Sequence, residues 1–288
     1  MIAALRTRPD AGGLSLVSLR ADDGAAADVY LHGAHVTSWR PAPGDEERLF
    51  LSGRSEFRNG AAIRGGIPVI FPQFAAEGPL PRHGFARTAT WSLDDVGRAA
   101  DGGHVATLSL RDSPETRAIW DARFLATLTV RVVGATLTTT LAVENVGASA
   151  LSFTGALHTY LRVHDVARAE VVGLEGARYR DAADRTTLRT ENTPMLRVTG
   201  ALDRVYVGAP TALLVREPER AVRVATRGFP DVVLWNPGRD AAAKLADMEP
   251  GGERAMLCVE AAVVQVPVTL APRARWEGSQ TLDAAARP

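Results

Sequence analysis

The sequence predicts an all-β protein, a large antiparallel β-sandwich with few short helices. Two observations predict it: short runs in which apolar and polar residues alternate, and turn residues that separate these runs at regular intervals. Alternation with a period of two places successive side chains on opposite faces of a strand. Such runs occur at residues 14–19, 27–31, 35–39, 104–110, 124–133, 137–143, 222–225, 232–235 and 256–264.

The connections and the scarcity of helices support the same fold class. Gly and Asn at residues 133–135 and 144–147 are typical of hairpin turns. The best helical patterns are short, at residues 114–120 and 240–248. Many strands with few helices favour a sandwich or barrel. Since no repeat, linker or change of composition divides the chain, we expect one domain over residues 1–288.

Composition limits the partners and the compartment. Lys and Arg together number 33, as do Asp and Glu, so no net field attracts nucleic acid or an anionic membrane. A single cysteine, Cys258, excludes an internal disulfide and fits a reducing compartment. The first ten residues lack the apolar run that is typical of a signal peptide, and no run of about 18 apolar residues occurs in the sequence. We therefore expect a soluble cytoplasmic protein that binds neither nucleic acid nor membranes.

Residues 64–87 are the most unusual stretch. Glycines and prolines interrupt it so often that no helix or long strand can form. Arg64, Arg82, His83 and Arg87 lie within this restrained, largely apolar segment. Guanidinium groups offer planar, bidentate donors that suit phosphate. The alternative is a set of surface arginines beside two buried apolar segments.

Residues 151–163 read as a strand with two different faces. Its odd positions are mostly apolar and are expected to face the core. The opposite face is polar and faces either solvent or a wet cavity; it carries Ser152, Thr154, His158, Tyr160 and Arg162.

Residues 256–264 read as a strand that is buried on both faces, with Glu260 as its only charged residue. A carboxylate in such a place finds a partner or takes a raised pKa. Glu260 is either a structural residue, at a frayed strand end or paired with an arginine, or a poised general base.

Metal and cofactor sites are not indicated. His32 and His35 are three residues apart, but no carboxylate or cysteine lies near them in the sequence. We expect no metal and no cofactor. Trp235 is compatible with either a core position or a role in stacking against a ligand.

Five segments resemble the aldose 1-epimerase (mutarotase) superfamily, and within it the branch that acts on D-hexose 6-phosphates. They are residues 64–72 (RGGIPVIFP), 80–87 (LPRHGFAR), 156–161 (ALHTYL), 233–237 (VLWNP) and 258–260 (CVE). The resemblance implies a galactose-mutarotase-like β-supersandwich with an open cleft and an isomerase that uses a hexose 6-phosphate as substrate.

The resemblance also implies roles for single residues. His158 corresponds to the histidine that protonates the ring oxygen, and Glu260 to the glutamate that takes the proton of the anomeric hydroxyl. Many relatives have Pro after this glutamate, where this chain has Ala261. We expect a looser loop around the carboxylate as a result.

By the same resemblance, the contacts to the sugar and its phosphate fall on Arg64, Arg82, His83, Arg87 and Asp203. Relatives often carry Gln at the position of Arg82, so this arginine is a departure that bears on phosphate contact or sugar preference.

Anomer interconversion needs a base at the C1 hydroxyl and an acid at the ring oxygen, and His158 and Glu260 supply that pair. Two other functions stay open at this point. A non-catalytic sugar-phosphate binding module would not need His158 and Glu260 to face each other. A mutarotase for unphosphorylated sugars would not need three arginines at one cleft. We expect the protein to act as a monomer.

Overall fold

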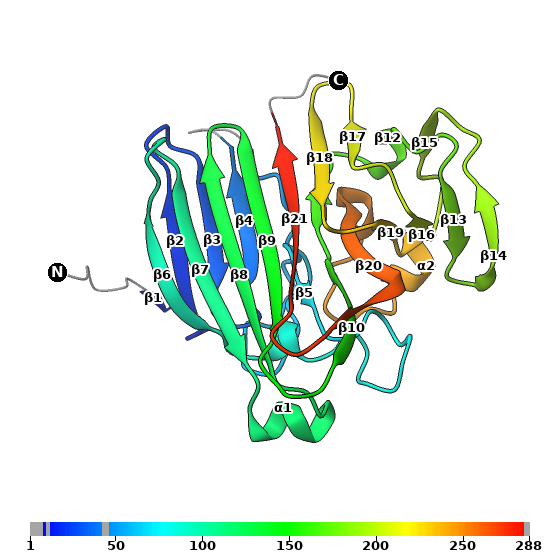
Figure 1. The fold of residues 1–288 in the computed structure, drawn as a ribbon. Coiled ribbons are helices and arrows are strands. Elements are labelled where there is room, and N and C mark those ends of the chain that lie inside the picture. The colour runs from blue at the N-terminus through cyan, green and yellow to red at the C-terminus, as the bar shows by residue number, and fades with distance from the viewer. Residues whose placement is uncertain (1–7, 10–11, 42–45, 285–288) are drawn as a thin grey trace.

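The computed structural model describes residues 8–9, 12–41 and 46–284, and it consists mainly of antiparallel strands in three sheets (Figure 1). Within these ranges the α-helices are α1 (Pro114–Ile119) and α2 (Gly238–Ala242). The predicted all-β class is confirmed. No helix in the described residues is both long and apolar enough to cross a bilayer.

A four-stranded sheet packs against a nine-stranded sheet. In Figure 1 the blue strands lie behind β7–β9, and buried side chains of both sheets share one core. The smaller sheet has the order β1 (Arg8–Pro9), β2 (Ser15–Arg20), β3 (Ala26–Tyr30) and β4 (His35–Arg40). The larger sheet has the order β15 (Met195–Arg197), β12 (Glu170–Val172), β17 (Ala212–Arg216), β18 (Ala221–Arg227), β21 (Arg275–Asp283), β9 (Thr136–Asn145), β8 (Phe124–Val133), β7 (His104–Arg111) and β6 (Ser92–Arg98).

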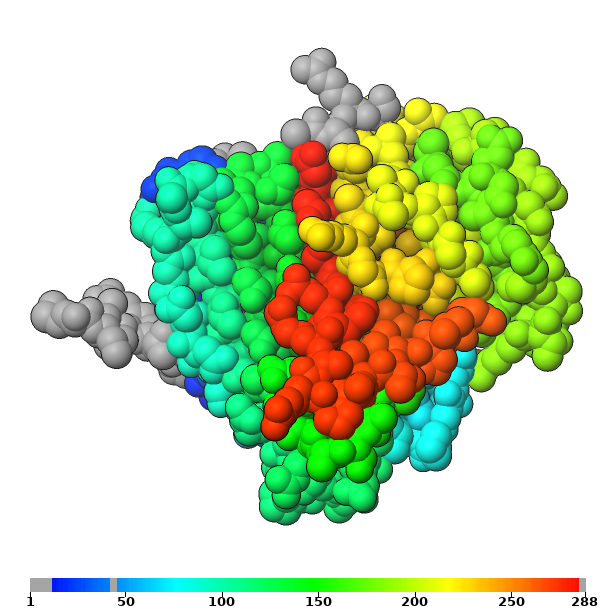
Figure 2. Space-filling view, in the orientation of Figure 1, coloured from blue at the N-terminus to red at the C-terminus, as the bar shows by residue number. Residues whose placement is uncertain are grey.

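The third sheet contains the segments with the unusual polar residues. Its central strand β20 (Met256–Leu270) pairs with β10, β11 and β19. The order is β14 (Asp184–Thr190), β13 (Arg178–Asp181), β16 (Leu202–Val207), β19 (Asp231–Asn236), β20, β10 (Leu151–Leu157) and β5 (Val69–Ile70), with β11 (Tyr160–Arg162) also on β20. The first part of β20 is buried, whereas its end and the turn into β21, orange to red in Figure 2, lie at the surface.

Two expected elements differ from the structure. Residues 151–163 form two strands, because the backbone turns where the Thr159 amide bonds to the carbonyl of Leu157. A register shift after Phe153 precedes this break. The helix expected at residues 240–248 ends at Ala242, after which the chain continues in tight turns.

The restrained loop at residues 64–87 is held against the four-stranded sheet by close backbone contacts. Gly66 has φ 62°, and a Cβ there would lie 2.2 Å from the carbonyl oxygen of Val36. Only glycine fits this position. The His35 imidazole donates to the carbonyl of Gly65 at 2.7 Å, and that of His32 donates to Ala61 at 2.6 Å. Both histidines thus bind loop carbonyls.

Candidate active site

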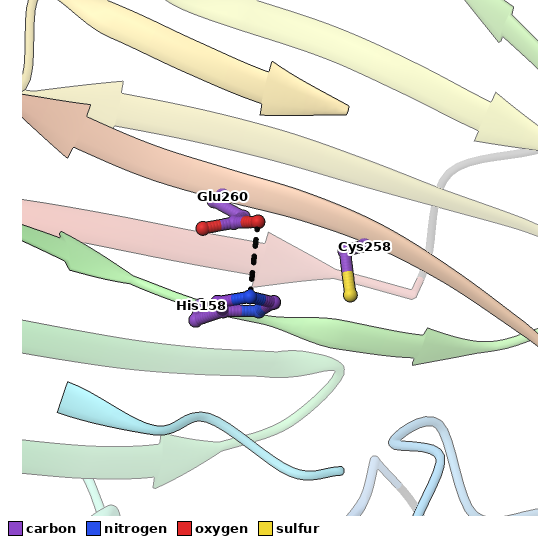
Figure 3. A group of neighbouring side chains, drawn as sticks. All are labelled: His158, Cys258 and Glu260. Carbon is purple, nitrogen blue, oxygen red and sulfur yellow. Dashed lines mark ion pairs between the residues drawn. The ribbon is translucent and has the colours of Figure 1, made fainter. Parts of the chain in front are cut away.

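Two adjacent strands bring His158 and Glu260 together. Glu260 lies within β20, opposite Val233 of β19, and His158 follows the last residue of β10. The Nε2 atom of His158 lies 3.3 Å from Oε1 of Glu260 (Figure 3). Glu260 is therefore not at a frayed strand end, and no arginine pairs with it among the described residues.

Burial controls the charge of this pair. The side chains of His158 and Glu260 are 10% and 2% exposed. Desolvation raises the pKa of Glu260 well above its ordinary value, and the carboxylate of Asp203 raises it further. Desolvation also lowers the pKa of His158, as do nearby His83, Arg87 and Arg64. Both shifts favour the state in which the pair holds a single proton.

The pair still has unused hydrogen-bonding atoms. His158 Nδ1 and Glu260 Oε2 are buried and have no partner. Buried polar atoms without partners are rare in folded proteins and call for a functional explanation. Both atoms belong to residues that line a cleft of about 450 Å³.

Aromatic rings fix the imidazole of His158 from two sides. Tyr160 stacks on it with ring centroids 4.9 Å apart, and Trp235 meets it edge-on at 6.0 Å. His158 and Tyr160 are both buried, so this part of the polar row belongs to a cavity wall and not to a solvent face. Trp235 itself lines the cleft, which favours a ligand-stacking role over a core position for this residue.

The cleft gathers every residue that the sequence singled out for the site. They come from the 64–87 loop, from the end of β10, from β16 and from β20. These lining residues are Arg64, Arg82, His83, Arg87, His158, Asp203 and Glu260.

Arg64 is already occupied by protein groups. Its guanidinium donates to both carboxylate oxygens of Asp247 at 3.2 Å, and its remaining terminal nitrogen donates to the Tyr160 hydroxyl at 3.0 Å. This chain of contacts links Asp247 to the ring that stacks on His158. Asp247 could not be predicted as a site residue, because it lies 183 residues from Arg64 along the chain.

Arg82 and Arg87 are the cations of the cleft without a carboxylate partner among the described residues. The one contact between them is a long bond of 3.5 Å from Arg87 to the carbonyl of Arg82. Burial lowers the pKa of Arg87, since desolvation and the neighbouring arginines disfavour its charge. This uncompensated positive charge can be neutralised by an anionic ligand.

His83 is a neutral residue in a strained conformation. Its φ of 66° lies in the left-handed region, which is uncommon outside glycine. The amide of Ala75 donates to its Nδ1 atom at 3.3 Å, which leaves Nε2 to carry the proton. Burial, together with Arg87 and Arg82, lowers the pKa of His83 to about 3. Strained residues of this kind concentrate at ligand sites.

Asp203 contributes a carboxylate to the lining of the cleft. It lies on β16, opposite Trp235 of β19. Burial raises the pKa of Asp203, although Arg82 opposes this shift.

Only one group of described residues has the donor types and closeness of a metal site. The ligand atoms of His158, Cys258 and Glu260 lie within 4.8 Å of one another. Cys258 is buried in an apolar cluster, and desolvation raises the pKa of its thiol well above the ordinary value. His158 and Glu260 are already paired with each other, and the thiol of Cys258 does not line the cleft.

The expected loosening after Glu260 is wrong. Ala261 and Ala262 continue β20 without interruption and pair with Val232 and Asp231 of β19. The carboxylate is therefore held by the middle of a strand with neighbours on both sides, and not by a loop.

Solved structures with this fold include mutarotases. A crystal structure described as a "putative mutarotase" from Salmonella typhimurium superposes with a TM-score of 0.88, at 29% identity over 99% of this chain and 98% of that one. The galactose 1-epimerase of Lactobacillus acidophilus has a TM-score of 0.73 over 97% and 98% of the two chains, and at 16% identity it supports the fold alone. The protein therefore has the fold of the galactose mutarotase-like β-sandwich proteins.

The sequence comparisons define the family. Residues 15–283 match the sequence profile of the family described as aldose 1-epimerase. A "Putative glucose-6-phosphate 1-epimerase" of Cenchrus ciliaris is 36% identical over 94% of this chain and 85% of its own length. A protein of the same name from Escherichia coli is 37% identical over 82% of this chain and 79% of its own length. The chain belongs to the aldose 1-epimerase family, and it is an isomerase that interconverts sugar anomers.

Proposed function

We propose that the protein interconverts the α and β anomers of a hexose 6-phosphate, with His158 and Glu260 as its acid–base pair. The observation that carries this proposal is the 3.3 Å contact of these two side chains in a cleft that also holds two arginines without carboxylate partners. The names of the curated relatives support the phosphorylated substrate.

The chemistry requires two proton transfers at one carbon centre. Ring opening takes the proton of the C1 hydroxyl and gives a proton to the ring oxygen, and closure on the other face reverses both transfers. Glu260 takes the hydroxyl proton and His158 protonates the ring oxygen. Atoms balance without any co-reactant, because the pair ends the cycle with the proton it started with.

The single proton of the pair suits this cycle. Burial favours the neutral forms of both groups. Movement of the proton from Glu260 to His158 across their contact creates the ionised base and the protonated acid together. No net charge enters the buried site in this step.

The other residues that line the cleft hold the substrate while its open chain rotates about the C1–C2 bond. Arg82 and Arg87 bind the phosphate, since their charge is not compensated within the protein. Asp203 and the edge of Arg64 bind sugar hydroxyls, His83 donates from Nε2, and Trp235 lies against the ring.

The close His158–Glu260 contact argues against a non-catalytic sugar-phosphate binding module, which would leave these groups apart. A mutarotase for free sugars is the alternative that an experiment must address. Anomerically pure glucose 6-phosphate and glucose should be followed by polarimetry with the wild-type protein. We expect a much higher kcat/KM with glucose 6-phosphate, and equal values for the two sugars would refute the phosphorylated substrate.

The pH dependence of kcat is expected to be flat near pH 6.5. An unperturbed pair would lose its shared proton as the histidine deprotonates at about this pH. Here burial lowers the pKa of His158 and raises that of Glu260, so the state with one proton extends to both sides. We expect kcat to stay level from about pH 5.5 to about pH 7.5.

This measurement uses kcat and not KM, because the phosphate of the substrate itself titrates at about pH 6. The uncatalysed rate is subtracted at every pH. A single transition in kcat at about pH 6.5 would contradict the assigned protonation states.

Three expectations about the protein as a whole stay predictions: one domain, a monomer, and a reducing cytoplasmic compartment. The free, buried thiol of Cys258 is compatible with such a compartment.

A further inference from the structure

The loop that carries Arg82 and His83 is closed on itself by short-range hydrogen bonds. The amide of Leu80 donates to the side-chain oxygen of Gln73 at 2.9 Å, and the Gln73 amide nitrogen donates back to the Leu80 carbonyl at 2.9 Å. The amide of His83 donates to the carbonyl of Ala75 at 2.9 Å. These bonds fix the shape of residues 73–83, but they do not fix where this loop lies relative to the opposite wall of the cleft.

One ion pair spans the cleft from this loop to β13. Glu77 at the tip of the loop accepts two hydrogen bonds from the terminal nitrogens of Arg180, at 2.7 and 3.3 Å. The Nε atom of Arg180 donates to Gln265 of β20 at 3.3 Å. The Arg180 side chain is 5% exposed, so its orientation is fixed by packing as well as by these bonds.

The same ion pair compensates a negative charge in the cleft, that of Glu77. Glu77 lines the cleft together with Arg82 and Arg87. A free carboxylate in that position would attract the arginines and repel a phosphate. Arg180, with Arg185 at 3.9 Å, instead compensates the carboxylate of Glu77. Arg82 and Arg87 are therefore left available.

We propose that the Glu77–Arg180 ion pair is a positioning device for phosphate recognition: it holds the 73–83 loop against β13 and keeps the Glu77 carboxylate away from Arg82. The inference rests on the proposed function of the cleft. Neither residue touches the reacting carbon in this scheme, so both act on the affinity for the phosphate and not on proton transfer.

The test compares the wild-type protein with Arg180→Met, Glu77→Gln and the double variant Glu77→Gln/Arg180→Met. Loss of Arg180 leaves a partly buried carboxylate without its partner beside the phosphate site, which costs more than loss of both charges. We expect Arg180→Met to raise KM for glucose 6-phosphate about tenfold or more, with kcat within about threefold of wild type. The double variant should recover the part of this loss that the unpaired carboxylate causes, but not the part that comes from the lost tie between the loop and β13.

A second readout does not depend on turnover. Inorganic phosphate should compete with substrate in the wild-type protein, and its inhibition constant should rise in Arg180→Met by about the same factor as KM. Arg220→Met is the matched control. Arg220 forms a comparable ion pair with Glu217, at 2.9 Å and with side chains 9% and 5% exposed, outside the cleft. It should lose stability without a change in KM.

The outcomes separate the two proposals. Turnover of glucose 6-phosphate by the wild type with an unchanged KM in Arg180→Met would refute the positioning role alone. An equal rise of KM in Arg220→Met would also refute it, since general destabilisation would then explain the effect. No preference of the wild type for glucose 6-phosphate would refute the proposed function. If Arg180→Met does not fold, the comparison uses Glu77→Gln, which keeps the shape of the side chain. This variant should raise KM by a smaller factor than the one expected for Arg180→Met.

Discussion

Glu260→Gln is expected to lower kcat for anomer interconversion by about 10²–10⁴-fold, the usual contribution of one positioned acid or base. The amide has the shape of the carboxyl group but cannot take the proton of the C1 hydroxyl. Because Glu260 is buried and its pKa is raised, the native protein already tolerates an uncharged group here. We therefore expect little change in the free energy of unfolding, measured by denaturant titration.

His158→Gln should have an effect of similar size, since the acid and the base act on one substrate molecule at the same time. The double variant Glu260→Gln/His158→Gln should be about as slow as either single variant, because residues that act as a unit are not additive. Glu217→Gln is the control: its side chain is also buried, at 5% exposed, but it lies outside the cleft. Unchanged rates in both single variants would show that the pair is not the catalytic pair.

The fold could be predicted because its signal is local. β8 has the bounds that alternation alone predicted, Phe124–Val133, and its burial alternates at every position. Each residue of such a strand reports which face it lies on without reference to distant parts of the chain. The buried first part of β20 was predicted for a related reason, since a run apolar on both faces has no solvent side.

The break in residues 151–163 could not be predicted in the same way. Thr159 turns out of the strand, and its hydroxyl donates to Gln280 of β21, 121 residues further along the chain. The alternating pattern continues through this break, because β10 and β11 pair with the same strand, β20, in the same register. A pattern of period two therefore marks the faces correctly but does not locate the end of the strand.

In the candidate site, too, some residues could be predicted from the sequence and others could not. The motif residues that the sequence analysis singled out line one cleft in the structure. The residues that fix these motifs were missed: Asp247 bonds to Arg64 across 183 residues, and Arg180 bonds to Glu77 across 103. Arginines and carboxylates are common at surfaces, so their types alone carry no information about such pairs. Only the fold makes them neighbours.

Arg87→Met is expected to raise KM for glucose 6-phosphate by about 10- to 100-fold, the range that loss of a hydrogen bond to a charged group implies. Arg87 lies in the cleft without a carboxylate partner, so its removal leaves no protein charge unpaired. Arg82→Gln should have a smaller effect, because Arg82 is exposed whereas Arg87 is half-buried. The KM of Arg87→Lys should fall between those of Arg87→Met and the wild type, since lysine keeps the charge but not the bidentate geometry.

Initial rates by polarimetry over a range of substrate concentrations give both kcat and KM, and the wild-type KM should rise with salt more steeply than that of Arg87→Met. If Arg87→Met binds glucose 6-phosphate and inorganic phosphate as tightly as the wild type, the phosphate lies elsewhere in the cleft, and Arg64 would have to give up Asp247 to bind it.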